Sequence, residues 1–391
     1  MKIIENNMIS VELIDKEDNF YSMKEIWNPL LRESRSETVF LTWEWLTSWW
    51  KAYGNGCKLF ILRVSQDGRV IGLAPFYMRK ITKYGLSYRT LALLGDGSDD
   101  SDYLDWISLN GEEDVVSRAV MDFLATHPEY WEILLLNEIP ETSVHIDSVR
   151  QFCRDRGWYW EDSKRPCAYV NLPTDWDVYL KSLKPRMRTK IRSLSSQLEE
   201  KFKICFAQCE RESDLQGRLE SLFDLHARRW SLEKQKGVFA TPEKKNFYLE
   251  MAAVFLSRGW LRFYSMAVDE RYLAHQFCFE YSNISFLLQE GFDPEWEQYG
   301  VGNVLRSHVF RDCINRGVRV YDFLGGVTTH KLSWGSEVKN SLRVSIGTPL
   351  KKNKLFFKIP KAIDGSKKII KDVLPESVVL WLKSKSAILN R

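Results

Sequence analysis

The sequence predicts a mixed α/β protein in which one order of elements occurs twice. Apolar residues recur at helical spacing in some segments and in short strand-like runs in others. In each half these segments follow the order strand, two helices, three strands, helix, strand, helix, strand. The three consecutive strands indicate an antiparallel front rather than an alternating strand–helix array. A chain of 391 residues fits two such units.

The first half begins with a short apolar strand and two amphipathic helices. Leu46, Trp49 and Tyr53 recur at i, i+3 and i+7 and define one helix face. The segment 66–69 contains a glycine between two apolar runs, which indicates a β-hairpin. The expected elements are a strand at 11–14, helices at 21–34 and 42–53, strands at 58–65, 70–78 and 88–95, a helix at 112–126, a strand at 131–139, a helix ending near residue 156 and a strand at about 167–172.

The second half repeats this order with clear helix signals. Pro242 stands in the first turn of its second helix and Gly259 follows the last turn, positions that these residues favour. The expected elements are a strand within 201–210, helices at 214–230 and 242–259, strands at 260–268, 272–280 and 284–292, a helix at about 303–316, a strand at 318–326, a short helical turn and a strand near 342–347.

The charge distribution suggests a division of the chain. We expect an N-terminal domain at 1–172, a C-terminal domain at 173–350 and a basic amphipathic tail at 351–391. The tail carries eleven Lys and Arg residues against three Asp and Glu residues. A basic helical connector joins the halves, with Lys184, Arg188 and Arg192 at i, i+4 and i+8. Such a stripe contacts a nucleotide or lipid phosphate, or forms a solvated helix face.

Composition and motifs exclude several classes of protein. The net charge of +4 creates no global field that would require nucleic acid. The seven cysteines form no dense framework and indicate reduced thiols in a cytoplasmic protein. No apolar run approaches the roughly 18 residues that span a bilayer, and the N-terminus lacks a signal-peptide core. The absence of GxxxxGK[ST], HExxH and CxxC patterns leaves no metal or nucleotide motif to propose.

One loop has the pattern of a phosphate site. Glu297-Gln298-Tyr299-Gly300-Val301-Gly302-Asn303 follows three strands and opens a helix. Glycines before a helix start leave backbone N–H groups free to hold phosphate, assisted by the helix dipole. A GxG pattern also occurs where the chain simply turns. The position of this one, after three strands and before a helix, favours a phosphate site.

At this point the sequence resembles the GNAT acyltransferases. The resemblance covers roughly residues 38–350 and is closest to the cellulose-biosynthesis acetyltransferase (CelD/BcsL-like) branch, which is related to the Fem-type peptidoglycan bridge-forming enzymes. It implies tandem GNAT-like folds, an acyl-coenzyme A donor and direct acyl transfer to an amine or hydroxyl. The motifs that carry it are FLTWEWLTSWW, LAPF, SDYLDW, KPRMRTKIR, LHARRW with the following GVF, GFDP, GVG and YDFLGG…HKLSWG.

The residues and the resemblance together suggest roles for particular side chains. Asp322 lies in an apolar strand row, where burial favours a proton acceptor, or is a structural buried carboxylate. Glu290 stands at a strand end beside the expected thioester, and His226 lies on an apolar helix face, as core histidines also do. The expected catalytic residues are Asp322, Glu290 and His226; the cofactor-binding residues are Gln289, Gly291, Gly300, Val301, Gly302 and Asn303; the substrate-binding residues are Arg229, Lys331, Asp102 and Tyr103.

The predicted function is acyl transfer from acyl-coenzyme A to a sugar-containing precursor of an exopolysaccharide or envelope polymer. The first half lacks a phosphate loop and is expected to serve the acceptor, with peripheral membrane contact through the basic tail and no nucleic-acid partner. Glu297 stands where relatives carry Arg or Gln, which favours the alternative of a non-catalytic binding or scaffold protein. A Fem-like ligase that uses aminoacyl-tRNA is a further alternative, although the short stretch between Trp230 and Pro242 leaves no room for a long helical arm.

Overall fold

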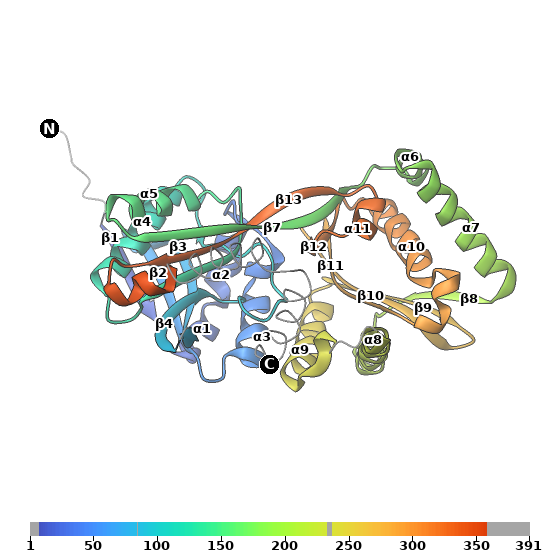
Figure 1. Ribbon diagram of the computed structural model, residues 1–391, viewed down its shortest axis with the longest axis horizontal. Coiled ribbons are helices and arrows are strands. Elements are labelled where there is room, and N and C mark those ends of the chain that lie inside the picture. Colours follow the sequence, from blue (N-terminus) through green and yellow to red (C-terminus); the bar gives the residue numbers. More distant parts are fainter. Residues whose placement is uncertain (1–7, 84, 233–236, 358–391) are drawn as a thin grey trace, which may run out of the picture.

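The computed structural model describes residues 8–83, 85–232 and 237–357. Residues 358–391, which hold most of the predicted basic tail, lie outside this range. The two halves of the chain lie side by side along the long axis of the molecule and share one sheet (Figure 1).

A single sheet of thirteen strands forms the backbone of the molecule. Its strand order is β1-β2-β3-β4-β6-β13-β7-β12-β11-β10-β9-β8, and β5 pairs with β3. The strands are β1 (Ile9–Ile14), β2 (Lys58–Gln66), β3 (Arg69–Lys83), β4 (Leu86–Leu93), β5 (Ile107–Ser108), β6 (Ile133–Pro140), β7 (Tyr159–Asn171), β8 (Ile204–Gln208), β9 (Leu261–Val268), β10 (Arg271–Tyr281), β11 (Ile284–Phe292), β12 (Val320–Gly325) and β13 (Glu337–Gly347).

The helices cover both faces of this sheet (Figure 1). They are α1 (Glu17–Ser22), α2 (Lys24–Arg32), α3 (Trp43–Tyr53), α4 (Glu113–Thr126), α5 (Ile146–Asp155), α6 (Trp176–Ser182), α7 (Pro185–Lys201), α8 (Glu212–Leu232), α9 (Pro242–Ser257), α10 (Val301–Asn315) and α11 (Thr329–Ser333), with short 3-10 turns η1 (Val39–Leu41), η2 (Val238–Ala240) and η3 (Pro294–Tyr299). The doubled order of elements predicted from the sequence is confirmed, except that two helices, α1 and α2, stand in place of the helix predicted at 21–34, and that β5 is an addition in the first half.

The last strand of the second half completes the sheet of the first half. β13 pairs antiparallel with β7 along its whole length and with β6 on its other side. β7 also pairs with β12, so the sheet runs unbroken from one half into the other. The division at residue 172 remains a prediction, and the position of β13 means that a cut there would separate strands that pair.

An aromatic interface holds the halves together. Trp45 on α3 is fully buried, and its ring packs edge-on against Phe247 and Phe279 of the second half, at centroid separations of 5.3 and 5.6 Å. Close beside it, the Lys244 ammonium lies 2.8 Å from the Asp100 carboxylate, and both side chains are buried. Burial of large aromatic surfaces favours a fixed arrangement of the two halves.

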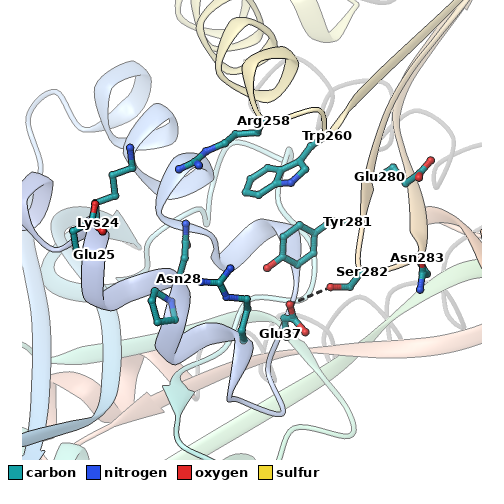
Figure 2. Close-up of a pocket in the computed structure, with 12 residues that line it drawn as sticks. Lys24, Glu25, Asn28, Glu37, Arg258, Trp260, Glu280, Tyr281, Ser282 and Asn283 are labelled. Atoms are coloured by element: carbon teal, nitrogen blue, oxygen red, sulfur yellow. Dashed lines mark hydrogen bonds between the residues drawn. The ribbon is translucent and has the colours of Figure 1, made fainter.

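A polar cavity of about 630 Å³ remains between α2 and the β10–β11 hairpin. Figure 2 shows that Trp260 and Tyr281 face it from the second half while Asn28 and Glu37 face it from the first. The Ser282 hydroxyl donates to Glu37 at 3.0 Å and bridges the two sides. This cavity lies at the hairpin end of β11, opposite the strand end that leads to α10.

Candidate functional site

The site begins where β11 and β12 separate. These parallel strands pair only from Ile284 to Phe286 on β11, opposite Val320 to Asp322 on β12. β11 then continues to Phe292 while paired with β10 alone, and its register against β10 shifts between Phe277 and Cys278. The parting of the strands that a GNAT-like fold implies is therefore present. It leaves backbone groups of β11 and β12 without sheet partners.

The turn into α10 presents backbone amides beside this opening. Asn303 and Val304 donate to the Gly300 carbonyl at 2.8 and 3.1 Å, which closes the first helical turn. Within the described residues, the amides of Val301 and Gly302 have no acceptor, as expected for the first positions of a helix. Gly300 has φ +61°, and a Cβ there would lie 2.5 Å from the Leu194 side chain of α7. This close approach requires glycine at position 300.

A cavity of about 720 Å³ joins the amide turn to the strand opening. It is bounded by α7, α8, the ends of β10 and β11, the start of α10 and α11. Its lining includes five of the six predicted cofactor-binding residues, two of the four predicted substrate-binding residues and one of the three predicted catalytic residues. Predicted residues that line it are Glu290, Gly291, Gly300, Val301, Gly302, Asn303, Arg229 and Lys331.

An ion pair closes the inner end of the cavity. The Arg306 guanidinium of α10 is 1% exposed and donates to the Glu290 carboxylate. Burial alone would raise the pKa of Glu290, but the charge and hydrogen bond of Arg306 hold that pKa below its ordinary value. Glu290 is therefore an ionised carboxylate at the position where the family resemblance implies a proton acceptor.

His330 and Asn303 extend this network toward the amide turn. The Arg306 Nη1 lies 3.1 Å from His330 Nδ1, and His330 Nε2 lies 3.1 Å from Asn303 Oδ1. Burial and the Arg306 charge lower the pKa of His330 to about 4, so its ring is neutral at pH 7. The carboxylate, guanidinium, imidazole and amide thus form one connected chain along the cavity wall.

The Arg306–Glu290 pair should be a strong contributor to stability. Replacing Arg306 by leucine leaves the Glu290 carboxylate, whose side chain is 30% exposed, without its cation. We expect the free energy of unfolding to fall by about 3 kcal/mol. In the double variant Arg306→Leu, Glu290→Leu most of this loss should return, because no unpaired charge remains. Denaturant unfolding of the wild type, Arg306→Leu, Glu290→Leu and the double variant measures the coupling, and equal losses in Arg306→Leu and the double variant would contradict it.

Lys331 occupies the gap at the β12 side. Its Nζ donates to the carbonyls of Phe323 and Gly325 at 2.8 and 2.9 Å, and the Leu324 carbonyl lies at 3.5 Å. Burial lowers the pKa of Lys331. The Lys331 ammonium therefore satisfies the backbone carbonyls at the end of β12. Its N–H donors are used within the protein, which does not favour the predicted role of binding an anionic substrate group.

Asp322 and Tyr103 do not line the cavity. The Tyr103 hydroxyl lies 3.0 Å from both Asp322 oxygens, the Leu324 amide donates at 2.8 Å and Lys339 Nζ lies at 2.7 Å. Asp322 is fully buried. These contacts use its acceptor capacity and tie β12 to the first half. This geometry favours the second interpretation of Asp322 from the sequence, that of a buried carboxylate with a structural role.

Asp102 is also a contact between the halves. Its carboxylate lies 2.9 Å from Arg165 Nη1 and accepts from the Gly325 amide at 3.2 Å. Burial raises the pKa of Asp102 to about 6, against the opposing effect of the Arg165 charge. Asp102 and Tyr103 hold β12 in place from the first half, and neither reaches the cavity.

The raised pKa of Asp102 predicts a dependence of stability on pH. The folded protein binds a proton at about pH 6, whereas an unfolded aspartate binds one near 3.9. Acidification from pH 7.5 to 5 should therefore raise the free energy of unfolding of the wild type relative to Asp102→Asn by about 1 kcal/mol. Urea unfolding at both values measures the difference. A difference that is constant or of opposite sign would contradict the assignment.

His226 and Gln289 lie close to the cavity but outside its lining. The Trp230 Nε1 donates to His226 Nε2 at 2.8 Å, and the buried Nδ1 of His226 has no partner in the described part of the chain. Burial, with the nearby charge of Arg229, lowers the pKa of His226 to about 4. His226 instead lines a separate hollow with Gly237 and Phe239. Gln289 is directed toward Tyr248 at the interface of the halves.

Three residues of the site were not selected from the sequence. Arg306, His330 and Lys190 line the cavity. Arg306 carried a usable signal, because it lies next to Leu305 on the inward face of α10 and a charged residue there requires a partner. His330 belongs to the HKLSWG motif, in which Lys331 is the predicted site residue. Glu297, noted as a departure from the family pattern, also lines the cavity.

Two further properties concern the described residues as a whole. Across residues 8–83, 85–232 and 237–357, no three His, Cys, Asp or Glu side chains gather into a possible metal site. Over the same ranges, no helix has both the length and the apolar character needed to cross a bilayer.

Comparison with known proteins supports the fold. FemX is similar over 89% of this chain and 99% of its own, with 11% identity and a TM-score of 0.60. A conserved protein of unknown function from Bacteroides thetaiotaomicron VPI-5482 is similar over 86% and 100%, with 10% identity and a TM-score of 0.56. The C-terminal domain of a putative lysylphosphatidylglycerol synthetase from Agrobacterium fabrum covers 84% and 92%, with 9% identity and a TM-score of 0.50.

At these identities the likeness concerns the fold alone. No curated protein sequence matches the chain significantly. Residues 185–332 match the family model described as an acetyltransferase (GNAT) domain, and they include the strand opening, the amide turn and the ion pair. The second half of this chain is therefore a GNAT acetyltransferase-type fold, and the first half repeats its order of elements.

Proposed function

We propose that the protein transfers an acyl group from acyl-coenzyme A to an amine or hydroxyl of a sugar-containing precursor in exopolysaccharide or envelope synthesis. The observation that carries the donor assignment is the cavity at the parted strands, whose outer end holds the unpartnered Val301 and Gly302 amides. Arg229 and Lys190 add positive charge to the same wall. Amides at a helix start together with cations suit a diphosphate.

The chemistry requires a proton acceptor and an oxyanion site. The acceptor oxygen or nitrogen attacks the thioester carbonyl, and Glu290 takes its proton. A backbone N–H group within residues 289–291, on the edge of β11 that has left β12, is suited to the negative charge of the tetrahedral intermediate. The carbon–sulfur bond then breaks, the coenzyme A thiolate is protonated from water, and the Glu290 proton passes to solvent.

The sugar class and the pathway rest on the sequence resemblance to the cellulose-biosynthesis acetyltransferase branch. The motifs SDYLDW and YDFLGG meet in the structure, because Tyr103 binds Asp322. We further propose that the acceptor approaches from the first half, where the corresponding helix α4 begins at Glu113 after Glu112 and without a GxG turn.

Calorimetry tests the donor directly. The protein is titrated with acetyl-coenzyme A, with longer acyl-coenzyme A and with free coenzyme A for comparison. The two thioesters should release or absorb heat on binding, and they should raise the melting temperature of the protein. Absence of both with every thioester would remove the donor assignment. A protein that binds sugar precursors but no thioester would be the non-catalytic binder. Transfer from charged tRNA in the absence of coenzyme A would establish the Fem-like alternative, with which the fold likeness to FemX is compatible.

A further inference from the structure

The exposed side of α7 carries an unneutralised cluster of positive charge. Within the described part of the chain, none of its cations forms an ion pair, and the only acids on α7 are Glu199 and Glu200 at the opposite end. The α7 helix lies along the outer edge of the second half, away from the first (Figure 1). The cluster, called the α7 basic face below, consists of Lys184, Arg186, Arg188, Lys190 and Arg192.

The basic face is not explained by helix stability. Met187, Ile191 and Leu198 are buried against the domain, so the cations flank this stripe on both sides. Small polar residues, Thr189 and Ser193, are exposed between the two rows. Cations in the first turns of a helix oppose its dipole and repel one another. An anionic partner outside the molecule would remove both costs.

Exposed aliphatic side chains border the same end of α7. Val178 on α6 is 54% exposed and Leu332 on α11 is 46% exposed. The two helices meet there, because the Tyr179 hydroxyl of α6 donates to the Trp334 carbonyl just after α11 at 2.8 Å. Aliphatic side chains gain from burial among lipid headgroups, whereas a nucleic-acid surface would be served better by aromatic side chains, and α7 has none.

We propose that the α7 basic face, with Val178 and Leu332, docks the protein on a membrane surface rich in anionic phospholipids. The array is extended and shallow, which suits many dispersed headgroup charges. Lys190 also lines the cavity together with Leu194. Docking would therefore bring the mouth of the cavity to the level of the headgroups. If the proposed acyl transfer holds, an acceptor carried on a lipid would reach the site from that side.

Vesicle co-sedimentation of the full chain tests the docking. We would compare phosphatidylcholine vesicles with vesicles that contain phosphatidylglycerol, at low and high salt. The test variant replaces Lys184, Arg186, Arg188 and Arg192 by glutamine and leaves Lys190, which lines the cavity, unchanged. The control variant removes the same charge from exposed positions of the first half: Lys16, Lys80, Arg118 and Arg154, each replaced by glutamine.

The wild type and the control should bind the anionic vesicles, and the test variant should bind at least about 10-fold more weakly. High salt should reduce the binding of the wild type toward that of the test variant. Melting temperatures check that the variants fold, and neutralisation should not lower them. Equal binding by the test variant and the control, equal binding to neutral vesicles, or α7-dependent binding to RNA in place of vesicles would overturn the proposal. Acyl-coenzyme A calorimetry is independent of this result, so the two proposals can fail separately.

Discussion

Replacing Gly300 by alanine should abolish measurable binding of acyl-coenzyme A, while the same replacement at Gly302 should leave it nearly intact. The backbone at Gly300 has φ +61°, and an added Cβ would meet the Leu194 Cδ1 at 2.5 Å. Alanine therefore forces the turn away from α7 and moves the free amides. At Gly302 a Cβ would lie 3.4 Å from the Phe292 ring, an ordinary contact, and alanine favours the helix.

Calorimetry with acetyl-coenzyme A measures this contrast, with an expected loss of at least about 100-fold at Gly300, or roughly 3 kcal/mol. Thermal unfolding of each variant separates a displaced turn from general misfolding. Adding Leu194→Ala to Gly300→Ala removes the clash but not the backbone strain, so affinity should return only in part. Equal affinity of the Gly300→Ala and Gly302→Ala proteins would show that the amide turn does not hold the donor.

Local patterns explain how much of the fold could be predicted. Each helix and strand has its own apolar periodicity and its own stop signals, so the doubled order of elements is visible in the sequence. The place of β13 between β6 and β7 is not, because strand order depends on pairing between segments about 200 residues apart in sequence. The doubled order of elements is therefore predictable from the sequence, whereas the pairing of strands between the two halves is not.

The same distinction separates the predicted residues that line the cavity from those that do not. Gly300, Val301 and Gly302 line it, and a glycine turn before a helix has a local signature in the sequence. Asp322 was selected for its apolar strand row, yet its partners Tyr103 and Lys339 come from distant segments. Arg306 was passed over for the same reason, because its partner Glu290 lies on another element. Buried charges are understood only once their counter-charges are located.

Substitutions at Glu290 and Asp322 distinguish which carboxylate accepts the proton. Glu290→Gln should lower kcat by about 10²- to 10⁴-fold with little change in acyl-coenzyme A affinity, because glutamine keeps the shape and an acceptor for Arg306; stability also falls, because the buried Arg306 charge loses its counter-charge. Asp322→Asn should leave kcat within about 3-fold and lower stability instead, because Asp322 faces Tyr103 and Lys339 rather than the cavity. Release of the coenzyme A thiol with a panel of amino-sugar and hydroxyl acceptors measures both variants.

The pH profile adds a constraint that a merely structural Glu290 would not obey. Arg306 holds the pKa of Glu290 below its ordinary value near 4.3, so the carboxylate stays ionised as the pH falls from 8 to 5. Weakening that hold with Arg306→Gln should let the pKa of the partly buried Glu290 carboxyl rise, and the acid limb of kcat should move upward in pH. A profile that is unchanged in Arg306→Gln, or a loss of kcat in Asp322→Asn alone, would transfer the role of proton acceptor away from Glu290. If the wild type binds thioesters but releases no coenzyme A thiol with any acceptor, the ion pair at the inner end of the cavity serves to shape a binding site, and the protein acts as a binder built on a transferase fold.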